Sequence, residues 1–176
     1  MIKEFLVAQN KEEALSLKRS TANSVFYAGG TEINRLNASV PGEVAIDLSK
    51  LGLNTIVQEK DGVFVGSMVA LQSLATSDVV PPWLKEPALF CGSFTRRNMA
   101  TVGGNFALMH GRSYVGPAIL ASRATVKIAT ITKDGTYAED DVPVREYHEH
   151  FDTYAGALIL GFFFKKSDRF VGTLRF

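Results

Sequence analysis

Two glycine-rich stretches decide how this sequence is interpreted, and the first reads Ala28-Gly29-Gly30-Thr31-Glu32-Ile33-Asn34. It follows an apolar run over residues 25–28 that predicts a strand. Paired glycines after a strand allow positive φ angles, so consecutive N–H groups can converge on one anion. A helix predicted over 32–36 would add the partial positive charge of its N-terminus. The stretch therefore predicts either a phosphate site or a tight turn with nothing bound.

The second stretch reads Ala100-Thr101-Val102-Gly103-Gly104-Asn105-Phe106-Ala107 and predicts another glycine turn. The Thr101 hydroxyl and the Asn105 amide can hydrogen-bond a ribose or a diphosphate, although Asn and Gly are also common in turns for backbone reasons. A dinucleotide has two phosphates and can lie between two lobes. Neither stretch matches G-x-G-x-x-G or G-x-x-x-x-G-K-[ST], which excludes a nicotinamide-type Rossmann site and a nucleoside-triphosphate P-loop.

The remaining sequence predicts two lobes with different organisation. Residues 1–51 alternate strands (4–7, 25–28, 44–48) with a helix that a capping box at Asn10 and Glu13 begins and that runs to about Ser20, which predicts a small α/β lobe. Residues 52–176 carry hairpin turns at 61–62 and 134–135. Helices are expected over 70–75, 83–90 and 118–121, and further strands over 126–131, 158–164 and 170–174. This second part predicts a larger α+β lobe.

Charge and composition exclude several classes of function. The 176 residues include 19 basic and 18 acidic ones, so no electrostatic feature favours nucleic acid or an anionic membrane. No apolar run approaches the roughly 18 residues that span a bilayer, and the N-terminus lacks the order of a secretory signal, so a cytoplasmic location is the default. Cys91 is the only cysteine, whereas an iron–sulfur cluster needs about four. No metal site is predicted.

The order and spacing of the two stretches resemble the FAD-binding (medium) subunit of molybdenum hydroxylases, the family of xanthine dehydrogenase and the carbon monoxide dehydrogenase flavoprotein subunit. Ala45-Ile46-Asp47-Leu48-Ser49, Val65-Gly66-Ser67 and Arg97-Asn98 add to the resemblance. The resemblance implies FAD as the cofactor. It implies an α+β fold of two lobes, of the vanillyl-alcohol-oxidase (PCMH-like) type, with the family's C-terminal domain absent.

The resemblance also implies how the parts divide the work. FAD would take electrons from a 2Fe-2S subunit and pass them to NAD or another acceptor, while a molybdenum-cofactor subunit oxidises the substrate. Because the flavin performs the redox chemistry, we nominate no catalytic residue. The implied cofactor-binding residues are Ala28, Gly29, Gly30, Thr31, Glu32, Ile33, Ala100, Thr101, Gly103, Gly104 and Asn105.

Two departures from the family keep other functions open. Tyr114 stands where the family commonly has an Asp that helps to hold the cofactor, and Arg112 beside it is either a compensating charge or a solvated side chain. The chain also stops within a strand pattern at Leu174-Arg175-Phe176, which predicts truncation. The first alternative is a degenerate flavin-subunit homologue that acts as a non-catalytic assembly module, with homo-oligomer formation possible. The second is a protein that binds a different nucleotide.

Several other side chains are expected to be structural. We expect Glu32 to face solvent or begin a helix rather than act as a base. Trp83 and the run 162–164 should pack in the core, and Cys91 should be buried and inert. For Tyr27, contact with adenine and simple packing remain equally open.

Overall fold

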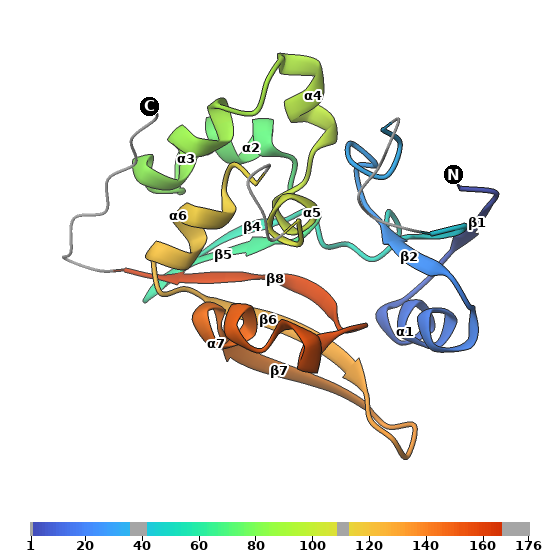
Figure 1. Cartoon of the computed structure of the whole chain (residues 1–176). Helices are drawn as coiled ribbons and strands as arrows, with labels where there is room; N and C mark the ends of the chain where they lie inside the picture. The colour runs from blue at the N-terminus through green and yellow to red at the C-terminus, as the bar shows by residue number, and fades with distance from the viewer. Residues whose placement is uncertain (1, 36–41, 109–112, 167–176) are drawn as a thin grey trace.

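The computed structural model describes residues 2–35, 42–108 and 113–166, and these form two sheets with helices around them (Figure 1). The smaller sheet has three parallel strands in the order β1 (Glu4–Val7), β3 (Val44–Asp47), β2 (Ser24–Tyr27). The three strands predicted for this part of the chain are confirmed within a residue. The predicted lobe boundary between residues 51 and 52 stays a prediction.

Helix α1 (Lys11–Ser20) connects β1 to β2 and begins as its capping signal predicts. The Asn10 side chain accepts a hydrogen bond from the Glu13 N–H at 2.8 Å, and the Glu13 carboxylate accepts one from the Gln9 N–H at 2.7 Å. These bonds satisfy backbone donors that the first helical turn leaves unpaired. Ala14 and Leu15 are the buried residues of this helix, which positions it against the small sheet.

The larger sheet has five antiparallel strands in the order β4 (Ile56–Glu59), β5 (Gly62–Gly66), β8 (Leu158–Lys165), β6 (Thr125–Ile131), β7 (Tyr137–Pro143). Both predicted hairpins are present, and Gly135 supplies a φ of +90° at the second. The last strand of the described chain, β8, lies between the two hairpins and joins them into one sheet. The strand predicted over 170–174 lies outside the described residues.

Short helices cover this sheet, and Figure 1 shows α2 (Leu71–Thr76), α3 (Pro82–Leu89) and α6 (Gly116–Ala121) gathered above it. These three were predicted. The sequence interpretation missed α4 (Phe94–Met99), α7 (Val144–Glu149) and the 3-10 turn Phe151–Tyr154. The main core lies between the helices and the sheet, where Phe162 and Phe106 make an edge-to-face contact at 4.9 Å. Trp83 packs edge-on against Phe164 at 5.8 Å, so the structural interpretation of these aromatic residues is confirmed.

The structure corrects two local predictions. Residues 31–35 form turns instead of the predicted helix, with the Asn34 N–H bonded to the Gly30 carbonyl at 3.0 Å. The second glycine stretch is not a turn but the helix α5 (Val102–Phe106), because the Thr101 side chain caps it by accepting from the Gly104 N–H. Glycine is a poor helix former and is common in turns, so the sequence favoured a turn here.

A second core cluster joins the two sheets. Leu15 of α1 and Ile46 of β3 pack with Ala129 of β6 and with Leu158 and Leu160 of β8. The small sheet is therefore held against the near ends of β6 and β8 by buried apolar contacts. Among the residues that the structure describes, no helix is long and apolar enough to cross a membrane.

Candidate functional site

The two glycine stretches meet in one cavity, although about seventy residues separate them in the sequence. All the predicted cofactor-binding residues except Gly103 line this cavity. The others in the lining are Phe26, Cys91, Arg96, Ala107, Leu108 and Tyr114. The predicted meeting of the two stretches is confirmed.

The first stretch needs glycine for two different reasons. A Cβ on Gly29 would lie 1.6 Å from the carbonyl oxygen of Met99, the last residue of α4, so the two chain segments touch through bare backbone. Gly30 has a φ of +65°, which L side chains rarely adopt. A Cβ there would also lie 2.2 Å from the Tyr27 hydroxyl oxygen. The glycine pair therefore fixes both the contact with α4 and the reversal of the chain.

The N–H groups of this turn point to an anion site. Within the described residues, the backbone N–H groups of Gly29, Gly30, Thr31 and Ile33 donate to no other group of the chain. Gly30 is buried and the other three are half-buried, so water satisfies these donors only in part. A run of partly buried, unpaired N–H groups in a glycine turn is the arrangement that binds phosphate without a lysine.

The second stretch contrasts with the first, because its backbone N–H groups already donate hydrogen bonds within the protein. The Val102 N–H donates to the Val69 carbonyl at 2.9 Å, and the Gly103 N–H donates to the Ser67 carbonyl at 2.8 Å. The Gly104 N–H donates to the Thr101 hydroxyl at 3.1 Å. The backbone amides of the second stretch are therefore not available to a diphosphate in the way that those of the first are. A Cβ on Gly103 would lie 2.6 Å from the Ser67 Cβ, so this glycine serves packing.

The Asn105 side chain organises the opposite wall of the cavity. Its Oδ1 accepts from the Tyr114 N–H at 2.8 Å, from the Val115 N–H at 2.9 Å and from the Ser113 hydroxyl at 3.3 Å. These three bonds hold the segment before α6, and with it Tyr114, in the lining. Asn105 thus shapes the wall through its oxygen. Arg112, predicted to be either a compensating charge or a solvated side chain, lies outside the described residues.

Charged groups in the cavity differ from the sequence expectation. Glu32 is only 6% exposed and its carboxylate pairs with Arg35 at 3.0 Å, so the solvent-facing and helix-terminal interpretations of Glu32 are both wrong. Arg96, which the sequence analysis did not nominate, brings a guanidinium to the cavity, and its Nε is buried without a hydrogen-bond partner. The only sequence signal for it was a pair of adjacent arginines before the second stretch.

The lone cysteine also lines this cavity. Cys91 is 1% exposed, which confirms that it is buried. Burial raises the pKa of the Cys91 thiol, and the nearby Arg96 guanidinium opposes that effect in part. A thiol with a raised pKa is a poor nucleophile, so Cys91 is a neutral wall residue.

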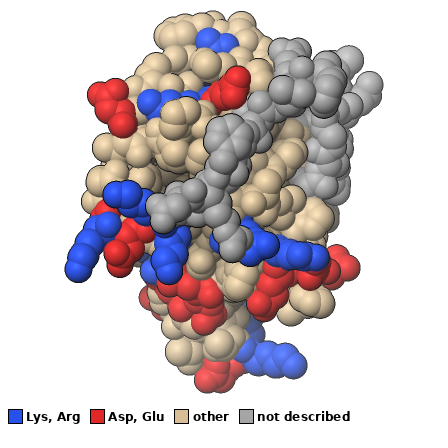
Figure 2. Space-filling model, turned by 90° about the vertical axis from the view of Figure 1, so that its left-hand side faces the viewer, with Lys and Arg blue, Asp and Glu red and all other residues tan. Residues whose placement is uncertain are grey.

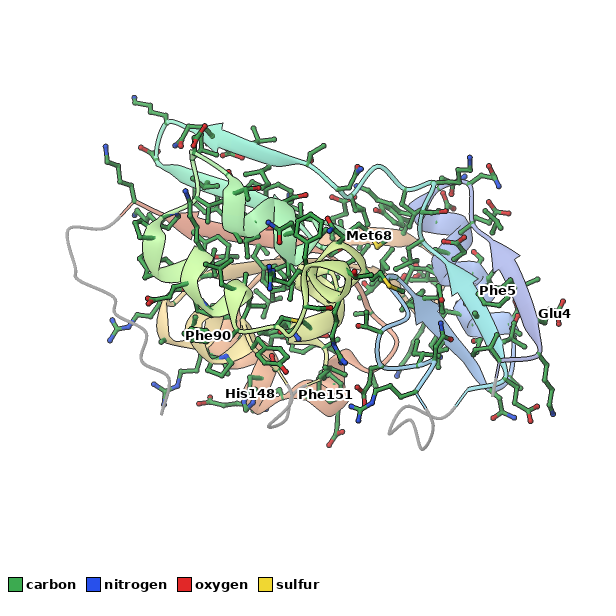
Figure 3. The ribbon with its side chains drawn as sticks, turned by 90° about the horizontal axis from the view of Figure 1, so that it is seen from above. Glu4, Phe5, Met68, Phe90, His148 and Phe151 are labelled. Carbon is green, nitrogen blue, oxygen red and sulfur yellow. The ribbon has the colours of Figure 1, made fainter. Side chains whose placement is uncertain are left out.

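A second, apolar cavity adjoins the first and shares Phe26, Ala28, Gly104 and Ala107 with it. Aromatic and aliphatic side chains dominate the rest of the lining, among them Met68, Tyr147, Phe151, Tyr154 and Leu158. Figure 3 shows Met68 at the junction of the two sheets and Phe151 on the side that faces the viewer of Figure 1. Sequence reasoning missed this cavity, because its walls come from distant segments.

Tyr147 of the apolar cavity and Tyr27 of β2 have structural partners. Burial raises the pKa of Tyr147 to about 12, so its hydroxyl stays neutral, and its ring stacks on Tyr154 at 5.1 Å. Tyr27 makes an edge contact with Phe5 at 5.1 Å and accepts a hydrogen bond from Asn34, which favours packing over contact with adenine. On the face drawn in Figure 2, basic and acidic side chains are interspersed, in keeping with the net charge of +1.

Comparison with known proteins identifies the family. Residues 2–164 match the family described as "FAD binding domain in molybdopterin dehydrogenase". The uncharacterized protein YgfM of Escherichia coli K12 is 32% identical over 122 residues, which cover 69% of this chain and 47% of YgfM. The chain thus spans about half the length of this curated relative.

Solved structures share the fold. Quinoline 2-oxidoreductase from Pseudomonas putida 86 matches with a TM-score of 0.79 and 19% identity, over 96% of this chain and 60% of that one. A carbon monoxide dehydrogenase from Hydrogenophaga pseudoflava matches at 0.74 with 22% identity, over 95% of this chain and 60% of that one. Aclacinomycin oxidoreductase matches more distantly, at 0.53 with 11% identity over 95% of this chain and 36% of that one.

These matches confirm the expected fold class, a mixed α+β FAD-binding fold of the PCMH-like type that is similar to oxidases of the vanillyl-alcohol-oxidase family. The residues at the cavity agree with a nucleotide cofactor, since unpaired amides lie beside an apolar pocket. The chain belongs to the family of FAD-binding domains of molybdopterin dehydrogenases.

Proposed function

We propose that this chain binds FAD in the two adjoining cavities and serves as the electron-transfer flavoprotein part of a molybdenum-containing hydroxylase or dehydrogenase. The observation that carries the proposal is a run of N–H groups, at Gly29, Gly30, Thr31 and Ile33, that have no partner among the described residues and lie in the lining of a cavity that adjoins an apolar one. Phosphate oxygens satisfy such donors, and an apolar cavity accepts a planar ring.

Each wall has a separate task in this proposal. The first glycine turn binds the diphosphate through its amides, and the buried Glu32 carboxylate can accept hydrogen bonds from ribose hydroxyls. Gly104 lines both cavities, and its lack of a side chain allows the cofactor to pass close to α5. The apolar cavity with Tyr147, Tyr154 and Met68 then accepts one of the two ring systems of FAD.

The redox chemistry belongs to the flavin, which accepts and donates electrons when it is bound. In the proposed enzyme a 2Fe-2S subunit supplies the electrons, a molybdenum-cofactor subunit oxidises the substrate, and NAD or another acceptor takes the electrons from the flavin. The single cysteine of the chain supports this division, because four ligands for a cluster must come from elsewhere. The residues of this chain position the cofactor and exclude water from it.

One observation favours the alternative of a non-catalytic assembly module. Phe94 and Met99 on α4 are 63% and 50% exposed, beside the contact between α4 and the first glycine turn. Large exposed apolar side chains at one helix favour a protein interface, either with a partner subunit or with a second copy of the chain. A module of this kind needs no cofactor, so FAD binding distinguishes the two functions.

The test is FAD uptake by the purified protein. We expect added FAD to bind and to show flavin absorbance bands near roughly 370 and 450 nm after removal of free cofactor. Gly104→Leu should abolish uptake, because its side chain enters the gap between Gly104 and Ala28, whose Cβ lies 3.9 Å from a Cβ built on Gly104. Ser73→Leu, on the exposed side of α2, is the matched control and should bind normally.

Two outcomes would overturn the proposal. A folded wild-type protein that takes up no FAD would favour the assembly module. Tighter binding of ATP or NADH than of FAD, measured in parallel titrations, would favour a different nucleotide.

A further inference from the structure

Two adjacent arginines on α4 have different surroundings. The Arg97 Nε donates to the Gln72 side chain at 2.8 Å, and its Nη1 donates to the Gly92 carbonyl at 2.8 Å. Arg97 is therefore fixed by the protein itself and does not line the cofactor cavity. Arg96 lines that cavity, and its buried Nε donates to no group among the described residues.

The charge of Arg96 has little compensation from the cavity walls. Among the described residues that line the cavity, Glu32 is the one carboxylate, and it pairs with Arg35 at 3.0 Å. The Cys91 thiol makes a side-chain hydrogen bond with the Arg96 guanidinium, but a thiol is a weak acceptor and burial favours its neutral form. A buried cationic N–H without an acceptor costs stability, and a ligand oxygen at this position would remove that cost.

Arg96 adds a charged donor to the side of the cavity that carries the first glycine turn. The first glycine turn supplies unpaired amides from one side, whereas the amides of α5 on the other side are used internally. Arg96 comes from α4, the helix whose last residue touches Gly29, so the guanidinium belongs to the same wall region as the turn. Guanidinium groups bind phosphate oxygens with two parallel hydrogen bonds, which a lysine cannot do.

We propose that Arg96 binds the diphosphate of the cofactor and supplies the positive charge that the amides of the second glycine stretch do not provide. This inference rests on the proposed function for the identity of the cofactor. Arg96 is then a specificity-determining residue that favours ligands with a diphosphate over the uncharged flavin alone.

The experiment compares Arg96→Met, Arg96→Lys and Arg97→Met with wild type, using FAD, ADP and riboflavin as probes in calorimetric titrations. Arg96→Met should weaken binding of FAD and of ADP by about 10- to 100-fold, because it removes charge-assisted hydrogen bonds. Riboflavin affinity should stay unchanged. Arg96→Lys should give an intermediate loss. Higher salt should weaken FAD binding by wild type more than by Arg96→Met.

Thermal unfolding of the ligand-free variants separates binding from a structural role. Arg96→Met should keep or raise the melting temperature, since it removes a poorly compensated cation. Arg97→Met loses two internal hydrogen bonds and should lower the melting temperature while its FAD affinity at 10 °C stays near that of wild type. A drop in melting temperature for Arg96→Met with unchanged FAD affinity would mean that Arg96 only supports the fold.

The outcomes distinguish this inference from the proposed function. If wild type binds ADP through Arg96 but takes up no FAD, the diphosphate role stands and the FAD assignment fails. If Arg96→Met binds FAD as tightly as wild type, the role of Arg96 is overturned while the FAD assignment stands. If wild type binds none of the three probes, both are overturned.

Discussion

The two glycine stretches have nearly the same composition and face the same cavity, yet their backbones do opposite things. At Gly29 and Gly30 the chain reverses with a φ of +65°, and its amides have no internal partner among the described residues. At Gly103 and Gly104 the chain is helical and its amides are bonded. A glycine pair therefore indicates a place where a side chain has no room. Whether the backbone N–H groups of that pair remain available to a ligand depends on the residues around it.

The largest predicted loss of stability is at Gly29, in the first glycine stretch. Gly29→Ala places a methyl group 1.6 Å from the Met99 carbonyl oxygen, which is backbone and cannot rotate away, so the turn and α4 must separate. We expect a loss of about 3 kcal/mol or more in the free energy of unfolding. The shift of the urea midpoint measures it.

Gly104→Ala is the matched control for Gly29→Ala. Its Cβ would lie 2.9 Å from the Thr101 hydroxyl, which can adjust, and alanine favours a helix over glycine by up to about 1 kcal/mol. Its stability should therefore stay within about 1 kcal/mol of wild type. Equal losses for the two variants would show that the two stretches are packed alike.

A second prediction concerns Asn105 of the helical stretch, whose side chain holds the segment before α6. Asn105→Ala leaves the N–H groups of Tyr114 and Val115 and the Ser113 hydroxyl without their acceptor. We expect a loss of about 2–3 kcal/mol, measured by urea unfolding, because these donors lie in a largely buried wall. Asn105→Asp keeps an acceptor oxygen and should recover most of that stability.

The aspartate variant also separates structure from binding. Its added negative charge in the cavity wall should repel a diphosphate, so FAD affinity should fall although the fold is retained. If Asn105→Ala is as stable as wild type, the wall does not depend on these hydrogen bonds.

Sequence patterns predicted the strands well, because alternation and turn residues are local. The hairpins at 61–62 and 134–135 and the Asn10 cap are examples.

The site was predicted only in part. Proximity of the glycine stretches followed from the family resemblance, but the helical form of α5 depends on the Thr101 cap and on contacts with Ser67 and Val69, which are distant in sequence. Arg96 and Arg97 cannot be told apart by composition, because their partners come from the fold.

The smallest predicted effect tests whether the amides of α5 are indeed occupied. Thr101→Ala removes the hydroxyl that accepts from the Gly104 N–H and caps the helix, so the free energy of unfolding should fall by about 1 kcal/mol. The same change releases the Gly104 N–H, at a residue that lines both cavities, so an anionic ligand gains a donor there. FAD affinity should therefore hold or increase slightly, and Thr101→Ser, which keeps the hydroxyl, should match wild type in both measurements. A clear loss of FAD affinity in Thr101→Ala without loss of folded protein would mean that the Thr101 hydroxyl itself contacts the cofactor, and that the second stretch binds by its side chains where the first binds by its backbone.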